Sequence, residues 1–201
     1  LNWMISHQPF MMSEIHGREK TYRETFQIEK TEKNIYSCYL RLQHQQERIF
    51  QQEIKYRRFR CRIHLRTFLG KQLVFTNRYE IIYFTKPLKK TGRLSYHEIQ
   101  QNFPKAGVKI KFRVCPFQTD DYDTRIWAYE SNVTHSFEFP SFSNQGFRFY
   151  FIMVITRIKN LSLSAKLGQT SWANKKNIDS GNELIEGNRR HSLTIQLHYK
   201  W

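Results

Sequence analysis

Cationic and apolar side chains alternate along residues 57–66, which read R-R-F-R-C-R-I-H-L-R. Successive side chains of a strand point to opposite faces, so this pattern predicts one apolar face and one face of Arg and His side chains. Residues 108–114 repeat the pattern, with Val, Ile and Phe alternating with Lys and Arg. Like charges in a row repel one another, so we expect a polyanion such as a nucleic-acid backbone to cover the cationic face. A basic strand face that is simply solvated is the alternative.

The overall charge agrees with a polyanionic partner. The 201 residues include 33 Lys and Arg against 17 Asp and Glu, for a formal net charge of +16. Much of this charge lies between residues 54 and 97, where Glu80 is the only acidic residue. Clustered positive charge of this size is typical of nucleic-acid-binding domains.

Residue types that could support catalysis or hold a metal are present but not grouped. The three cysteines, Cys38, Cys61 and Cys115, form no C-x-x-C motif, and the eight His residues show no ligand-like spacing. Asp120, Asp121 and Asp123 could bind a hard cation, but an exposed acidic turn is the simpler interpretation. We therefore expect no catalytic residue, no metal and no cofactor. The short apolar runs of residues 1–12 predict neither a signal peptide nor a transmembrane helix, so we also expect no membrane contact in a reduced, non-secreted setting.

The elements that must position the cations are predicted from periodicity. We expect a helix over 37–53 and amphipathic strands over 57–68, 108–115 and 191–200. Residues 73–84 fit either a strand or a short helix. Residues 147–158 form an apolar run whose periodicity does not distinguish helix from strand. Loops are expected over the basic 85–107 and the polar 162–188, and an insertion over 116–146.

Together these elements predict an α+β fold, an antiparallel sheet with helices packed on one face. Residues 1–36 would form an N-terminal extension and 37–201 one domain. The side chains expected to be buried against the helices are Phe59, Cys61, Ile63, Leu65, Ile110 and Phe112.

Several short motifs follow one another in an order known from a ribosomal protein family. They are Lys86-Pro87-Leu88, Gln101, Phe103-Pro104, Gly107, the strand 109–113, the segment 156–166 and the final strand 188–195, with 62–66 in the place of a first strand. This order resembles the bacterial and organellar large-subunit ribosomal protein five family, which binds 5S rRNA in the central protuberance. The resemblance spans roughly residues 37–200 and departs from the family at the turn reduced to Gly70 and at Thr85, which replaces a glycine.

The resemblance implies a divergent mitochondrial-type constituent of the large ribosomal subunit, located in the matrix. Its implied partners are ribosomal RNA, including 5S rRNA where present, neighbouring ribosomal proteins, peptidyl-site tRNA and the small subunit. The tRNA would meet a projecting loop over residues 91–106 through Arg93, His97 and Lys105. The predicted RNA-binding residues are Arg58, Arg60, Arg62, Arg66, Lys86, Lys89, Lys90, Arg93, Lys109, Lys111, Arg113, Lys166, Arg189 and Arg190. Two alternatives stay open: a small basic viral coat protein, and an RNA-binding or RNA-processing factor outside the ribosome.

Overall fold

The computed structural model describes residues 2–12, 19–49, 55–134, 136–178 and 184–200, with side chains described within 23–46, 56–134, 136–178 and 184–200. Almost all of the described chain is extended. The elements are β1 (Asn2–Met12), β2 (Glu19–Glu32), β3 (Tyr36–Ile49), β4 (Lys55–Leu69), β5 (Leu73–Lys86), β6 (Leu88–Phe103), β7 (Val108–Thr119), the 3-10 turn η1 (Tyr122–Thr124), β8 (Ile126–Trp127), β9 (Ser141–Phe142), β10 (Gln145–Ile155), β11 (Leu161–Trp172), β12 (Asn177–Ile178), β13 (Ile185–Glu186) and β14 (Arg189–Tyr199).

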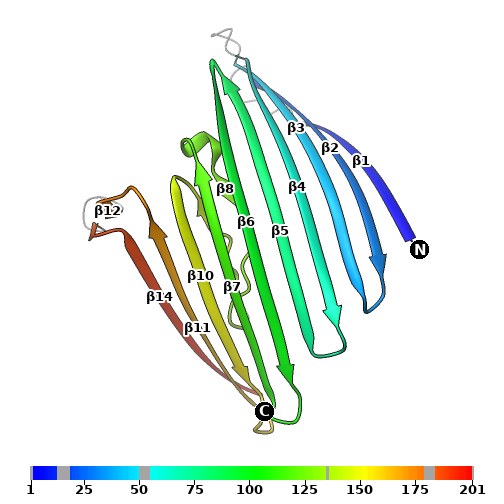
Figure 1. The fold of residues 1–201 in the computed structure, drawn as a ribbon, viewed down its shortest axis with the longest axis vertical. Coiled ribbons are helices and arrows are strands. Elements are labelled where there is room, and N and C mark those ends of the chain that lie inside the picture. Colours follow the sequence, from blue (N-terminus) through cyan, green and yellow to red (C-terminus); the bar gives the residue numbers. More distant parts are fainter. Residues whose placement is uncertain (1, 13–18, 50–54, 135, 179–183, 201) are drawn as a thin grey trace.

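The long strands form one antiparallel sheet in the order β1-β2-β3-β4-β5-β6-β7-β10-β11-β14. Each strand pairs with its neighbours along nearly its whole length, as β4 does with β5 from Arg57↔Thr85 to Leu69↔Leu73. Figure 1 shows the result as a single curved layer of long, inclined strands, with the segment between β7 and β10 lying across one of its faces.

The two ends of the sheet are connected differently. At the lower end in Figure 1, short turns join the strands, over residues 33–35, 70–72, 104–107 and 156–160. Each of these turns contains one residue with positive φ, namely Asn34, Gly70, Gly107 and Asn160, because a tight reversal between strands needs the left-handed backbone region. The long connection 120–144 leaves from the opposite end, as does the chain after β11, and at that end the single residue Pro87 joins β5 to β6.

The predicted α+β fold is wrong, because the structure is an antiparallel sheet with no α-helix among its described residues. No helix in the described part of the chain has the length and hydropathy to cross a bilayer. The predicted helix over 37–53 is instead strand β3 as far as Ile49, and residues 50–53 lie outside the described residues. Along β3, Cys38, Leu40 and Leu42 alternate with polar neighbours, and pairing with both β2 and β4 satisfies its backbone. That non-local pairing outweighs the local helical pattern.

The predicted strands over 57–68, 108–115 and 191–200 are confirmed as parts of β4, β7 and β14. The ambiguous segments 73–84 and 147–158 belong largely to β5 and β10. Two predicted loops are wrong in part, because 88–103 form β6 and 161–172 form β11. The first 36 residues include β1 and β2 of the same sheet, and β7 extends to Thr119 before the chain leaves the sheet.

The hydrophobic core lies between the sheet and the segment 120–144. It consists of Ile82, Leu94, Tyr96, Cys115 and Phe117 from the sheet and Ile126, Ala128 and Phe142 from the segment. We call residues 120–144 the covering segment. The sheet face beneath it carries buried ion pairs, and we call it the ionic face.

Candidate functional site: an exposed apolar face and a covered ionic face

The sheet face away from the covering segment carries large exposed apolar side chains, and we call it the apolar face. Cross-strand register places Ile99, Phe112, Phe151, Leu167 and Leu193 in one row across five strands. All five are exposed. Other exposed members on the same face are Phe59, Ile63, Leu65, Tyr79, Tyr83, Phe103, Phe147, Leu163, Ile195, Leu197 and Tyr199.

The predicted burial of the strand faces is therefore inverted. Four of the six apolar side chains of β4 and β7 that were expected under helices are exposed, namely Phe59, Ile63 (51%), Leu65 and Phe112, and the other two, Cys61 and Ile110, are half-buried. On the opposite side, Arg113 is buried and Arg60 and Arg62 are largely covered. The alternation was recognised correctly, but the face that is packed is the charged one.

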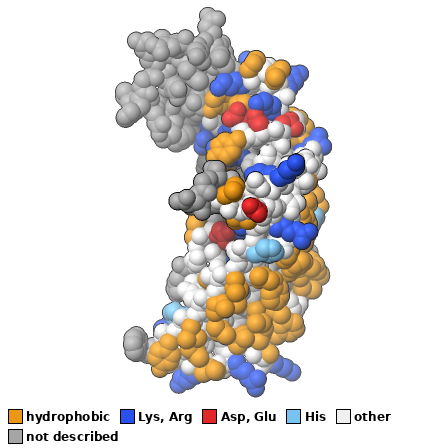
Figure 2. Space-filling model, turned by 90° about the vertical axis from the view of Figure 1, so that its left-hand side faces the viewer, with side chains coloured by type: hydrophobic (Ala, Val, Ile, Leu, Met, Phe, Trp, Pro, Cys, Tyr) orange, Lys and Arg blue, Asp and Glu red, His pale blue; other side chains and the backbone are white. Residues whose placement is uncertain are grey.

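Figure 2 shows the apolar face from the side of β14. Hydrophobic side chains gather over the lower half of the molecule, bounded below by Lys and Arg and above by a mixed charged region. The turns and strand ends at the lower end of the sheet carry the exposed basic residues Lys105, Arg157, Lys159 and Lys200. The apolar surface is thus a band with a charged border.

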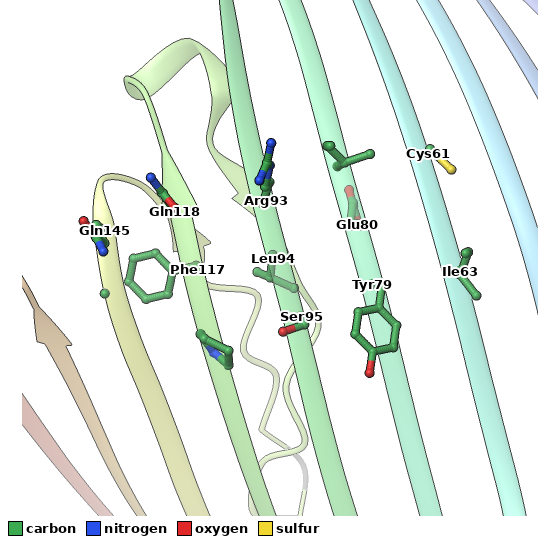
Figure 3. A pocket seen from close by; sticks show the side chains of 13 residues that line it. Cys61, Ile63, Tyr79, Glu80, Arg93, Leu94, Ser95, Phe117, Gln118 and Gln145 are labelled. Atoms are coloured by element: carbon green, nitrogen blue, oxygen red, sulfur yellow. The ribbon is translucent and has the colours of Figure 1, made fainter.

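A shallow groove lies on this face, near the upper boundary of the band (Figure 3). Its volume is about 510 Å³. Figure 3 shows Arg93, Gln118 and Gln145 toward one end and Ile63 and Tyr79 toward the other. One end of the groove is therefore lined by polar side chains and the other end by apolar and aromatic ones.

The ionic face is held to the covering segment by hydrogen bonds from long cationic side chains. Arg78 donates to the carbonyl oxygen of Trp127 at 3.0 Å, and Arg113 donates to that of Tyr129 at 2.6 Å. Lys111 donates to the Ser131 hydroxyl at 2.8 Å. Backbone carbonyls in a covered site need such donors, so the strand cations fix the path of the segment.

The strongest attachment centres on Glu130, whose side chain is 1% exposed. Arg148 of β10 binds both of its carboxylate oxygens, Nε to Oε1 at 2.6 Å and Nη2 to Oε2 at 2.8 Å. Lys166 of β11 lies 3.2 Å from Oε2. Glu138 pairs with Glu130 in an isolated β-bridge. Its carboxylate accepts from Arg148 Nη2 at 2.8 Å and from Lys166 Nζ at 2.5 Å. Two carboxylates of the covering segment thus neutralise two cations of the sheet.

A second buried carboxylate, Glu98, joins three strands. Arg113 donates to it from Nε at 3.0 Å, and the hydroxyl of Tyr150 also donates to it. Tyr150 is fully buried and its ring lies 5.1 Å from the Arg113 guanidinium. These contacts pair and hydrogen-bond the charge, which is the condition under which charges are stable in a protein interior.

The third carboxylate, Glu80, is shared by three arginines. Arg62 donates from Nε at 2.7 Å, Arg78 binds the same oxygen, and Arg60 Nε lies 3.2 Å from the other oxygen. The positive charge therefore exceeds the negative charge at this point of the ionic face.

One further ion pair lies at the start of the covering segment. Lys90 and the backbone amide of Thr124 donate to the Asp121 carboxylate. Partial burial alone would raise the pKa of Asp121, but these two donors lower it. The acidic turn at 120–123 is thus tied to β6.

The predicted RNA-binding residues do not form one surface. Register and ion pairs place Arg60, Arg62, Lys109, Lys111, Arg113, Lys166 and Arg190 on the ionic face, together with Arg58, Arg66 and Lys86 by strand alternation. By the same alternation, Lys89, Arg93 and Arg189 lie on the apolar side. Lys90 is engaged by Asp121.

The predicted tRNA-proximal loop also differs from the structure. Arg93 and His97 lie within β6, and only Lys105 lies in a turn, at the end of that strand. Sequence reasoning missed the acidic residues Glu98, Glu130 and Glu138 and their partner Arg148. Each of these acids stands alone among apolar, polar or basic residues, and this isolation was the signal that the sequence offered. It did not identify their partners, because the partners are distant in the chain.

The scan against protein-family models, the search of curated proteins and the search of solved structures each found no match.

Proposed function

We propose that this chain is a membrane-embedded sheet, whose apolar face contacts lipid acyl chains and whose ionic face borders a polar interior partly filled by the covering segment. The role is structural and non-catalytic: the sheet separates lipid from a charged compartment.

The observation that carries this proposal is the inverted burial of the two faces. In water, a sheet covers its apolar face and leaves its charged face solvated. Here Glu80, Glu98, Arg113 and Arg148 are buried while a row of Phe, Leu and Ile is exposed. A contiguous exposed apolar surface of this extent marks an interaction site, and hydrocarbon is the solvent in which the arrangement is stable.

The height of the band agrees with a bilayer. On β7 the apolar positions run from Val108 to Pro116, and on β4 from Phe59 to Leu69. At about 3.4 Å per residue these stretches measure about 27 and 34 Å along the strand. Strands inclined by about 40° would then cover about 21 to 26 Å of depth, close to the apolar band of about 25 Å found in membrane-spanning sheets.

The connections show the same polarity. Membrane-spanning strands are commonly joined by short turns on one side and longer segments on the other. In this chain the turns after β2, β4, β6 and β10 are short. The covering segment leaves from the opposite end, where Pro87 also forms one short connection, between β5 and β6. Basic side chains at the lower border would lie at the level of the lipid headgroups.

The location in lipid adds a requirement for the two sheet edges. Within the described residues, β1 and β14 each have a neighbouring strand on one side only. An unpaired backbone donor or acceptor costs several kcal/mol in hydrocarbon, so both edges must pair with a further strand in the membrane.

Binding to ribosomal RNA in a mitochondrial large subunit stays a prediction, as do the viral coat and RNA-processing alternatives. The helices that the resemblance implies are absent from the described chain. Four of the strand cations that were to meet RNA, Arg60, Arg62, Arg113 and Lys166, form ion pairs with Glu80, Glu98, Glu130 and Glu138.

Fractionation separates these possibilities. The full chain should remain in membrane pellets after alkaline carbonate and urea washes, and should float with vesicles after reconstitution. Sedimentation with large ribosomal subunits, or assembly into shells, together with complete extraction by carbonate would overturn the proposal.

A pair of neighbouring substitutions provides a matched control. Ile195→Arg places a charge in the apolar band and should lower the stability of the inserted protein by about 2–4 kcal/mol. Thr194→Arg adds the same side chain on the opposite face and should leave insertion nearly unchanged. Equal effects of the two substitutions would show that β14 has no lipid-facing side.

A further inference from the structure

Cations are in excess on the ionic face where the covering segment does not lie over it. The inward positions of β3, β4 and β5 carry Arg41, Arg58, Arg60, Arg62, Arg66, Arg78 and Lys86. Within residues 36–46, 56–69 and 73–86, Glu80 is the only carboxylate on this face. Arg58 of β4 donates to the carbonyl oxygen of Asp123 in the covering segment at 2.9 Å. The other side-chain contacts of the segment come from β5, β6, β7, β10 and β11, so Arg41 of β3 and Arg60, Arg62 and Arg66 of β4 lie beside it.

Arg41, Arg60 and Arg62 occupy neighbouring inward positions of β3 and β4. Arg41 is opposite Arg62, and Arg60 is opposite Gln43, one inward position along. Arg62 gives two of its donors to Glu80, and Arg41 gives Nε to Gln27 at 2.7 Å. Within the described part of the chain, Arg60 makes one hydrogen bond, from Nη1 to Gln43 at 3.3 Å.

Arg60 is the member best placed to meet a solute. Its Nε lies 3.2 Å from Glu80 but makes no aligned hydrogen bond, and its side chain is 22% exposed. Glu80 already accepts from Arg62 and Arg78, so it cannot neutralise Arg60 as well. A planar guanidinium with open donors beside a second one matches the oxygens of a phosphate-type anion, to which Arg can donate two parallel hydrogen bonds.

We propose that Arg60 and Arg41 form the centre of a binding site for a soluble polyvalent oxyanion, such as a phosphorylated solute, on the ionic face beside the covering segment. Two or more negative charges are required, because three arginines share one carboxylate. The site does not depend on what covers the apolar face, so it can be tested apart from the membrane proposal.

The test is calorimetric titration of the full chain in a maltoside detergent, which carries no phosphate, with inorganic pyrophosphate as probe. We expect saturable binding, weakened about tenfold or more by Arg60→Gln and further by Arg41→Gln/Arg60→Gln. The slope of log K against log salt should fall by about one unit for each cation removed. Arg57→Gln, on the same strand but the opposite face, should leave binding unchanged.

Three results would overturn the assignment: no binding of pyrophosphate, an affinity equal in the wild type and Arg60→Gln, or an equal loss in Arg57→Gln. Binding only to vesicles containing anionic phospholipid, lost in Arg60→Gln, would assign the site to a lipid headgroup instead of a soluble solute. An unchanged urea midpoint for Arg60→Gln confirms that a loss of binding is not a loss of folding.

Discussion

Replacing Glu130 with Gln tests whether the buried ion pairs hold the covering segment on the sheet. The substitution keeps the shape of the side chain but removes the charge that faces Arg148 and Lys166, whose side chains are 9% and 3% exposed. Glu138 would remain as the only carboxylate that contacts either of these cations in the described structure. Removing one partner of a buried pair costs about 3–5 kcal/mol, because the remaining charge stays buried.

Glu138 still partly neutralises the two cations in Glu130→Gln, so we expect a loss of unfolding free energy near the lower end of this range, at about 3 kcal/mol. This corresponds to a factor of about one hundred in the unfolding equilibrium constant. The matched variant Glu138→Gln removes a carboxylate that is 35% exposed. Solvent screening weakens that interaction, so its cost should be only about 1 kcal/mol. The order of the two variants follows from burial alone, since both acids contact the same cations.

Reversible urea unfolding in detergent measures both values. A loss of 3 kcal/mol should lower the urea midpoint by about 1 M or more for a slope of 2–3 kcal/mol/M. Limited proteolysis should show faster cleavage within 120–144 for Glu130→Gln. A loss below 1 kcal/mol for Glu130→Gln, or a larger loss for Glu138→Gln, would refute the electrostatic attachment of the segment.

Two further substitutions test the packing beneath the covering segment. Gly92→Ala would bring a Cβ to 2.3 Å from a carbonyl oxygen of η1, so we expect a loss of about 1–3 kcal/mol and release of that turn, measured by unfolding and proteolysis, with Ser95→Ala as the unaffected control. Ile82 is fully buried in the core, so Ile82→Ala should cost about 2–5 kcal/mol in the same unfolding assay, whereas Ile81→Ala on the apolar face should cost clearly less. Equal costs at 81 and 82 would contradict the assignment of the faces.

The sequence predicts the strands better than it predicts which face they bury. Alternation in β4 and β7 is strict enough to identify both strands and their two faces. The choice of the buried face depends on Glu80, Glu98 and Glu130, which meet the cations only through cross-strand register and the covering segment. Neither the register nor the path of that segment is encoded in local periodicity.

Two missed strands have a similar explanation. The Gln-rich end of β3 hides the alternation of its apolar residues, and β11 reads as polar because Ser, Lys and Gly occupy its inward positions. Small and polar residues at inward positions are unusual for a strand that buries one face in a hydrophobic core. They are expected in a strand whose inward face meets charged groups and whose outward face meets hydrocarbon.

The most direct test of the central claim is a lipid-quenching scan of β14. Single cysteines at residues 192–197, in a chain whose native cysteines are replaced by Ser or Ala, would carry an environment-sensitive fluorophore in vesicles that contain nitroxide-labelled lipids. The account predicts strong quenching at 193, 195 and 197 and weak quenching at 192, 194 and 196. Uniform quenching, no quenching, or the opposite alternation would contradict a lipid-facing apolar sheet.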